Sequence, residues 1–160
     1  MDKKEYQEKL DDINRAIAVE DYATAAGIAD AIDWKRVRNV QTLLMVSEIY
    51  EAENRYEDSK NLLMRAYRRS PLGRTVLYRL VECTIALKEF DEAIEYYSEY
   101  CQAAPKDNNR YILKYKIYRG RGSSIEEQID ILKQYLKQEK DSEKWSYELA
   151  KLYKEAGYNF

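Results

Sequence analysis

The sequence contains no histidine, and its 160 residues include only two cysteines, two prolines and five glycines. Without histidine the chain lacks the commonest general base and the commonest metal ligand. It also has no glycine-rich phosphate loop and no Cys-x2-Cys pair. Neighbouring acids such as Glu126 and Glu127 point about 100° apart on a helix and do not share one site. We therefore expect no enzymatic activity, no metal site and no cofactor.

Long apolar runs are missing as well. No run approaches the ~18 residues that a membrane-spanning helix needs, and the first ten residues have no apolar core of the kind found in signal peptides. We therefore expect a cytoplasmic protein without membrane contact, in which Cys83 and Cys101 are free thiols. The net charge of −2 gives no overall attraction to nucleic acid or to a membrane surface.

The remaining composition favours a folded, helical chain. Hydrophobic residues make up 45% of the sequence and charged residues 35%, a balance that argues against disorder. The scarcity of proline and glycine favours helices over a sheet-rich fold. A chain of this length can form a single domain that buries roughly two-thirds of its unfolded surface.

One stretch of sequence occurs twice, 34 residues apart, as Leu43–Pro71 and Leu77–Pro105. Each copy combines two helical patterns and closes on one of the two prolines, which disfavour helix in the residue before them. The equivalent pairs are Leu43 and Leu77, Val46 and Leu80, Tyr56 and Phe90, Ser59 and Ala93, Leu63 and Tyr97, and Pro71 and Pro105. Two copies in register indicate a repeat protein.

A 34-residue period made of two helical segments resembles the tetratricopeptide repeat. Its two half-motifs correspond here to Leu43-x2-Val46-Ser47-x2-Tyr50, and to Ser59-x3-Leu63 and Ala93-x3-Tyr97. The resemblance implies an all-α fold, a right-handed α-solenoid of about four antiparallel helix pairs followed by a final helix. It also implies that the chain holds other proteins.

We expect a single tetratricopeptide-like domain over residues 1–160. The repeats fall at about 4–35, 37–71, 74–105 and 108–140, with a half repeat at 142–160. The periodicity predicts helices at about 4–19, 21–33, 37–53, 56–69, 74–88, 91–103, 108–119, 124–138 and 142–156. In the fourth repeat, the triplet Gly120-Arg121-Gly122 predicts a helix break. Gln128, which replaces a small residue, predicts looser packing there.

The final helix has two interpretations. It is either the solvating end helix of a stacked array or the first half of a further repeat in a longer protein. The family-like motif Leu149-Ala150-x2-Tyr153 favours the second. In that case Tyr158 and Phe160 are anchored in the intact protein.

Sixteen tyrosines are the most unusual feature of the composition. Tyr111, Tyr115 and Tyr118 have i, i+4, i+7 spacing and form one helical stripe. Tyrosine packs as a large hydrophobe with a polar tip, and it is also enriched at binding hot spots. Both roles, packing between helices and contact with a ligand, stay open for these residues.

The resemblance also predicts where a ligand binds. In tetratricopeptide-repeat proteins the first helices of the pairs line a concave groove that receives an extended peptide or a helix. The helical period gives the stripe Glu8, Asp11 and Arg15, then Gln41, Leu44, Glu48 and Glu51, then Thr75, Tyr78, Glu82 and Ile85. The fourth repeat is ambiguous, with Arg110 and Lys114 as candidates.

The stripe is largely acidic, and Leu44 and Tyr78 are its apolar residues for contact with a ligand. We therefore expect a basic, aromatic-containing partner segment. Related proteins that clamp the carboxylate of chaperone C-terminal tails use lysines, asparagines and an arginine. Arg79 fits that set, but Met45 and Thr75 stand where an asparagine and a lysine are expected. The sequence therefore argues against chaperone-tail binding.

Charge is also banded along the chain. Residues 60–79 carry six bases and no acid, residues 82–99 six acids and one base, and residues 106–121 six bases and one acid. Basic bands could bind RNA or another polyanion. Helices of opposite sign also compensate one another in a solenoid, and the net charge argues against a nucleic-acid partner.

The function that we predict is that of a non-catalytic adaptor or scaffold, which binds a peptide or helix of a partner protein in its groove. The alternative is a structural or regulatory domain of a longer chain, acting by self-association or intramolecular docking. Polyanion binding is a weaker alternative.

Overall fold

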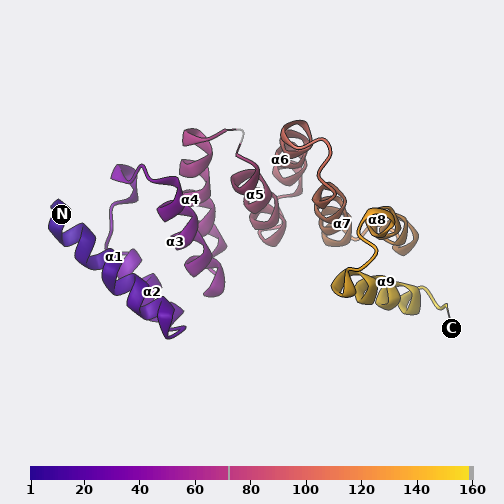
Figure 1. Cartoon of the computed structure of the whole chain (residues 1–160), viewed down its shortest axis with the longest axis horizontal. Coiled ribbons are helices and arrows are strands. Elements are labelled where there is room, and N and C mark those ends of the chain that lie inside the picture. Colours follow the sequence, from indigo (N-terminus) through magenta and orange to yellow (C-terminus); the bar gives the residue numbers. More distant parts are fainter. Residues whose placement is uncertain (72, 159–160) are drawn as a thin grey trace. The chain divides into compact units, whose positions relative to one another are not determined.

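The computed structural model describes residues 1–71 and 73–158, and within them the chain is all helical. The helices are α1 (Lys3–Ala18), α2 (Tyr22–Ala29), the 3-10 helix η1 (Trp34–Arg36), α3 (Val40–Ala52), α4 (Tyr56–Arg69), α5 (Arg74–Ala86), α6 (Phe90–Ala103), α7 (Asn109–Arg121), α8 (Ile125–Gln138) and α9 (Glu143–Glu155) (Figure 1). The chain forms two compact units, Met1–Val76 and Leu77–Phe160, which we call the N-terminal and C-terminal units.

The first helices of the repeats are α1, α3, α5, α7 and α9, and all five end in the same way. A residue one or two positions after the end of each helix has a positive φ, and these residues are Glu20, Asn54, Lys88, Gly122 and Gly157. The next N–H in each case donates to the carbonyl five residues earlier, at 2.8–3.0 Å. This left-handed C-cap satisfies helix-end carbonyls and turns the chain back. The caps recur at intervals of 34, 34, 34 and 35 residues, so the backbone itself carries the repeat.

The extra residue of the fourth repeat lies in the turn after α7. Gly122 keeps the 34-residue interval, and α8 starts one residue later because Ser124 caps it, accepting the Glu127 N–H at 3.2 Å. The helix break expected at Gly120-Arg121-Gly122 occurs at Gly122, so α7 continues to Arg121, two residues beyond the predicted end at 119. Glycine suits this helical position because another side chain lies against it. A Cβ built there would come within 2.8 Å of the Phe90 ring.

In the N-terminal unit α2 contacts both α1 and α3, and α3 contacts α4. Small residues of α2 lie at these contacts, and Ala25 and Ala29 have no exposed surface. Short side chains allow close helix approach. The largest fully buried side chains of this unit are Ile13, Leu43, Ile49 and Leu63.

Two helix boundaries of the N-terminal unit differ from the prediction. The helix expected over 21–33 ends at Ala29, and Trp34 donates its indole N–H to the Ala29 carbonyl at 3.0 Å. The helix expected from residue 37 begins at Val40, because the Asn39 side chain accepts the Thr42 N–H at 3.0 Å as an N-cap. Capping side chains therefore shorten both helices.

A polar cluster stabilises the N-terminal unit between α2, α3 and α4. Arg55 donates to both carboxylate oxygens of Asp30, at 3.0 and 2.8 Å, and to Asp58 at 2.8 Å. The Tyr50 hydroxyl donates to Asp30 at 2.9 Å. The Arg55 hydrogen bonds hold the pKa of Asp30 below its usual value, and burial, followed by the Asp30 contact, raises the pKa of Tyr50.

The C-terminal unit has a more aromatic core. Its buried cluster joins α7, α8 and α9 and contains Ile112, Tyr115, Ile129, Ile131, Leu132, Tyr135 and Leu152. Trp145 packs edge-to-face on Tyr115 and Tyr135, with ring centroids 5.9 and 6.3 Å apart. Tyr111 and Tyr118 pack against the same cluster, so the predicted tyrosine stripe contributes to helix packing.

Gln128 is buried in this unit, although we expected it to loosen the fourth repeat. Its amide donates to the Ser123 carbonyl at 2.9 Å and accepts from Arg119 at 3.3 Å. Cys83 and Cys101 are free thiols, the first buried and the second half-buried.

Candidate functional site

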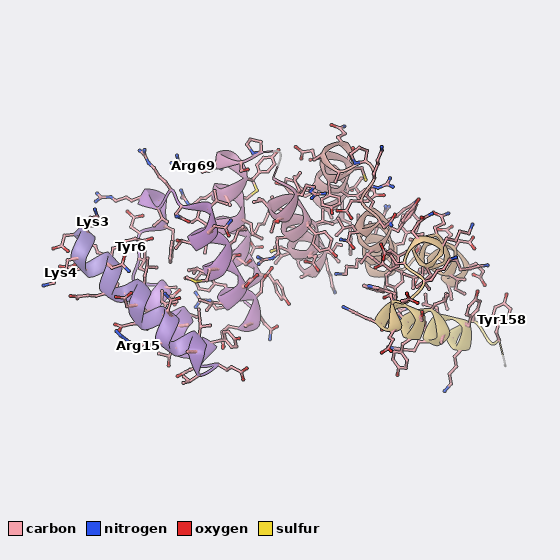
Figure 2. All side chains as sticks on the ribbon, in the orientation of Figure 1. Lys3, Lys4, Tyr6, Arg15, Arg69 and Tyr158 are labelled. Atoms are coloured by element: carbon pink, nitrogen blue, oxygen red, sulfur yellow. The ribbon has the colours of Figure 1, made fainter. Side chains whose placement is uncertain are left out.

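The predicted binding residues of α1 lie on the surface of the N-terminal unit. Glu8, Asp11 and Arg15 are all exposed, and Arg15 is seen on the α1 ribbon in Figure 2. Asp11 accepts a hydrogen bond from Gln7 at 3.1 Å, and Arg15 forms an ion pair with Asp12 at 2.9 Å. Arg15, the basic residue of this stripe, is thus paired with an acid of its own helix. The charges that α1 leaves exposed in the stripe are therefore acidic.

The predicted residues of α3 divide by exposure. Gln41 and Glu48 are exposed and Glu51 is half-buried, whereas Leu44 is only 8% exposed and offers little surface to a ligand. Glu48 and Glu51 each already take part in a polar or electrostatic interaction within the protein. A ligand at these carboxylates therefore has to compete with interactions that are already formed.

In α5 the predicted residues form contacts with a neighbouring helix. Thr75 is exposed, whereas Tyr78, Arg79 and Glu82 are half-buried, and Arg79 has a polar or electrostatic partner of its own. Glu82 accepts from Lys116 of α7 at 2.6 Å. Lys116 also lies 5.6 Å from the centre of the Tyr78 ring. The negative charge expected at Glu82 is therefore offset within the C-terminal unit.

Lys116 was not predicted as a site residue, although the sequence contains a signal for it. Arg110 and Lys114 were the candidates in α7, because this helix is apolar on nearly every side. Lys116 lies 34 residues after Glu82, one repeat along the chain. Adding the period of 34 to the residue number of each predicted binding residue would have identified Lys116.

A second ion pair joins the next two first helices. Arg119 of α7 donates to both carboxylate oxygens of Glu155 in α9, at 3.0 and 3.2 Å. The contact lowers the pKa of Glu155 and raises that of Arg119. The first helices α5, α7 and α9 are therefore linked by charge pairs on their polar sides.

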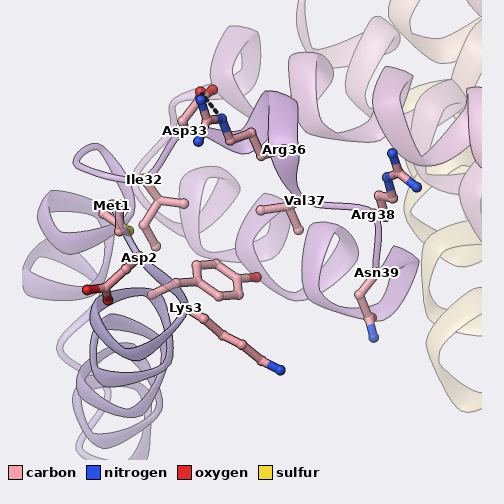
Figure 3. Close-up of a pocket in the computed structure, with 10 residues that line it drawn as sticks. Met1, Asp2, Lys3, Ile32, Asp33, Arg36, Val37, Arg38 and Asn39 are labelled. Atoms are coloured by element: carbon pink, nitrogen blue, oxygen red, sulfur yellow. Dashed lines mark ion pairs between the residues drawn. The ribbon is translucent and has the colours of Figure 1, made fainter.

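A cleft opens in the N-terminal unit between the start of α1 and the segment that leads into α3. It encloses about 440 Å³ and has a mainly apolar lining. Figure 3 shows Ile32 and Val37 directed into this space, Lys3 along one side, and Arg36 with its ion pair to Asp33. The lining residues are Met1, Asp2, Lys3, Tyr6, Ile32, Asp33, Arg36, Val37, Arg38 and Asn39.

Basic side chains surround the apolar interior of this cleft. Lys3, Arg36 and Arg38 are exposed. Arg36 forms an ion pair with Asp33 at 3.7 Å, with 80% and 58% of the two side chains exposed. Within residues 1–71 and 73–158, Lys3 and Arg38 have no side-chain hydrogen bond or ion pair. Burial raises the pKa of the Tyr6 hydroxyl at the same cleft. The site combines an apolar interior with a rim of three basic side chains and two acidic ones, Asp2 and Asp33; of the basic side chains, Lys3 and Arg38 are not paired with these acids.

Within residues 1–71 and 73–158, no group of three or more histidine, cysteine, aspartate or glutamate side chains is arranged to hold a metal ion. Over the same residues, no helix has both the length and the apolar character needed to cross a bilayer.

No protein-family model matches the sequence, and no curated protein matches it. Solved structures do resemble it. MamA 41-end from Desulfovibrio magneticus RS-1 is similar with a TM-score of 0.71 and 15% identity, over 94% of this chain and 84% of that chain. A crystal structure of a tetratricopeptide repeat protein from Parabacteroides merdae gives a TM-score of 0.69 at 13% identity, over 96% and 74%.

A crystal form of MamA AMB-1 resembles the chain at 20% identity and a TM-score of 0.63, over 98% of this chain and 91% of that one. These likenesses extend over nearly the whole chain and agree with the repeated helix caps. At such low identities they concern the fold alone. The chain therefore has the all-α, solenoid fold of tetratricopeptide-repeat proteins.

Proposed function

We propose that this protein is a non-catalytic interaction module that holds a segment of a partner protein on the surface of its first helices. The observation that carries the proposal is the tetratricopeptide-repeat fold along the full chain, because stacked helix pairs present extended surfaces for binding. Fold does not determine function, so the residues that bind must be tested separately. A cytoplasmic location is part of the same proposal.

The stripe of α1 is the part of the predicted groove best suited to a ligand. Glu8 and Asp11 are exposed, and neither is in an ion pair within the described residues. Glu82, by contrast, is paired with Lys116. A basic segment with an aromatic residue fits the exposed acids through charge complementarity.

Titration with a synthetic peptide tests this proposal. The probe is a blocked peptide of alternating lysine and glycine with one central tyrosine, followed by fluorescence anisotropy. We expect Glu8→Lys with Asp11→Lys to weaken binding about tenfold, since two attractions become repulsions. Raised salt should weaken it too.

The matched control is Glu95→Lys with Asp130→Lys, which reverses two exposed acids of the C-terminal unit. It makes the same change in net charge and should alter the affinity less than about twofold. Equal losses in both variants would show non-specific attraction and would reject the stripe as the binding surface.

Self-association is the second candidate function, and exposed aromatic residues favour it. Tyr147 and Tyr158, at the end of the described chain, are 67% and 53% exposed. Sedimentation across a wide range of protein concentration tests it, with Tyr147→Ser as the variant. A species that stays monomeric throughout would reject this alternative.

A further inference from the structure

The cleft between α1 and the 32–39 segment has the properties of a preformed ligand site. Its volume of about 440 Å³ falls within the range of small-ligand and side-chain pockets. Ile32 is 6% exposed and forms part of the wall, with Val37 on the connecting segment and Tyr6 on α1. A bulky apolar side chain that enters this space removes apolar surface from water on both partners.

The cations at the rim have no structural role that explains their position. Lys3 lies in the first turn of α1, where the helix dipole favours acidic residues over basic ones. Arg38 precedes α3 and makes no polar side-chain contact among the described residues. Arg36 makes only an exposed pair with Asp33, and such pairs contribute little to stability. These charges are available to a ligand.

The rim also limits the chemistry of that ligand. Lys3 lies on α1, whereas Arg36 and Arg38 lie on the 32–39 segment, so the positive charges are on two separate parts of the backbone. Two or more acidic groups around one apolar group match them better. A uniformly charged polyanion would leave the apolar interior empty, and a purely apolar ligand would leave the cations without counter-charges.

We propose that this cleft binds an extended acidic segment of a partner protein, with one bulky apolar side chain in the cleft and acidic side chains on either side of it. The apolar side chain lies against Ile32, Val37 and Tyr6. The flanking carboxylates pair with Lys3 and with Arg38 or Arg36. The site is separate from the stripe of Glu8 and Asp11, and it rests on the proposed function only in that its ligand is a protein segment.

The two sites require opposite charges. On α1 the basic residues Lys3 and Lys4 occupy the first turn (Figure 2). Glu8 and Asp11 follow one and two turns later in the sequence of the helix. The acidic ligand of the cleft therefore differs from the basic ligand of the stripe, and each can be tested without the other.

A set of blocked seven-residue peptides provides the test, with binding followed by isothermal calorimetry on the full chain carrying any tag at its C-terminal end. The probe has a central leucine with two glutamates on each side. One comparison peptide replaces the leucine by serine, and another replaces the glutamates by glutamines. We expect both changes to reduce affinity at least about fivefold, because the apolar and the charged contacts contribute together.

Protein variants identify the site. Lys3→Glu with Arg38→Glu changes two exposed positions and should weaken binding of the leucine probe about tenfold. Val37→Asp places a charge inside the cleft and should weaken it at least as much. Circular dichroism verifies that each variant is folded. The matched control, Lys133→Glu with Lys140→Glu in the C-terminal unit, should change affinity less than about twofold.

Several results would overturn the inference. Absence of binding by the leucine probe would reject the cleft as an acidic-peptide site, as would equal affinity for the serine peptide. Equal effects of the cleft and control variants would assign the binding to net charge alone. Failure here leaves the basic-peptide titration at Glu8 and Asp11 unaffected, so the two proposals stand or fall separately.

Discussion

The two units of the molecule use the same repeat but stabilise it with different polar contacts. In the N-terminal unit the main polar cluster joins Asp30 at the end of α2 to Arg55 and Asp58 at the start of α4. In the C-terminal unit the strong pairs are Glu82 with Lys116 and Arg119 with Glu155, and both connect one first helix to the next.

This difference decides which surface is left for a ligand. Ion pairs between first helices occupy charges that would otherwise face a bound segment, as they do at Glu82. Within residues 1–71 and 73–158, the α1 acids Glu8 and Asp11 form no such pair, and the side chains of Lys3 and Arg38 at the cleft have no hydrogen-bond or ion-pair partner. The repeat period places residues 34 apart in equivalent positions, and the sign of the charge at those positions determines whether they pair.

Each unit contains one tryptophan, which allows the comparison to be tested unit by unit. Trp34 reports on the N-terminal unit and Trp145 on the C-terminal unit. Leu63 and Leu132 are both fully buried, one in each. We expect Leu132→Ala to cost about 2–5 kcal/mol and to lower the urea midpoint reported by Trp145 more than that reported by Trp34.

Leu63→Ala should lower the urea midpoint reported by Trp34 more than that reported by Trp145. The measurement is tryptophan fluorescence in backgrounds that retain only one tryptophan, Trp34→Phe or Trp145→Phe. If both variants shift the urea midpoint equally at Trp34 and Trp145, the two units unfold together, and they do not differ in stability.

Two helical glycines should respond in opposite ways. A Cβ at Gly120 in α7 meets the Phe90 ring at 2.8 Å, whereas at Gly27 in α2 no atom lies within 4 Å. We expect Gly120→Ala to destabilise the C-terminal unit by about 1–3 kcal/mol through overpacking. Gly27→Ala should stabilise the N-terminal unit by roughly 0.5–1 kcal/mol through helix propensity. Thermal unfolding of both variants checks the signs, and a stabilised Gly120→Ala would contradict the close contact.

The Asp30 cluster should make the N-terminal unit sensitive to acid. The pKa of Asp30 is lowered in the folded state, so its contribution is complete above the unfolded value of about 3.9 and is lost as pH falls through the lower folded value. We expect Asp30→Asn to cost about 1 kcal/mol at neutral pH, a modest figure because 45% of the Asp30 side chain is exposed.

Urea unfolding at neutral pH and at pH about 3, read from Trp34, measures this contribution. The difference in the free energy of unfolding between wild type and Asp30→Asn should be smaller at the lower pH. A difference that stays constant would show that the Asp30 charge does not contribute to stability.

The smallest expected effect concerns the left-handed caps. The N-terminal unit closes its first helices with Glu20 and Asn54, whereas two of the three caps in the C-terminal unit are Gly122 and Gly157. Only glycine adopts positive φ without strain, and asparagine tolerates it better than glutamate. Glu20→Gly should therefore stabilise its unit by up to about 1 kcal/mol, and Gly122→Ala should destabilise its unit by about 1 kcal/mol. Thermal unfolding measures both changes in stability. If the two substitutions change stability in the same direction, the cap assignment is contradicted.

Much of the fold could be predicted from the sequence. The 34-residue period, the helix over 56–69 and the end of the helix at Gln138 agree with the structure. The errors concern helix ends, where local capping decides. Asn39 delays α3, and the left-handed cap at Gly122 lets α7 continue through Gly120. Short-range competition of this kind is not visible in a hydrophobic pattern.

The candidate sites were predicted less completely. The stripe of Glu8 and Asp11 follows from helical periodicity, and its role in binding stays a prediction. The cleft was not predicted, because Lys3 and Arg38 lie more than thirty residues apart and no repeat relation connects them. Their position at one cleft depends on the path of the 32–39 segment, both ends of which (32–33 and 37–39) we had predicted to be helical.

The sequence by itself determined the all-helical class and the repeat, because both are periodic properties of consecutive residues. The repeat boundaries at the two prolines and most helix ends could also be predicted from it. Only the tertiary structure decided which charges are paired and which face solvent, since Glu82 and Lys116 meet across two helices. The cleft likewise exists only in three dimensions, where the start of α1 and the segment before α3 enclose a space that neither forms alone.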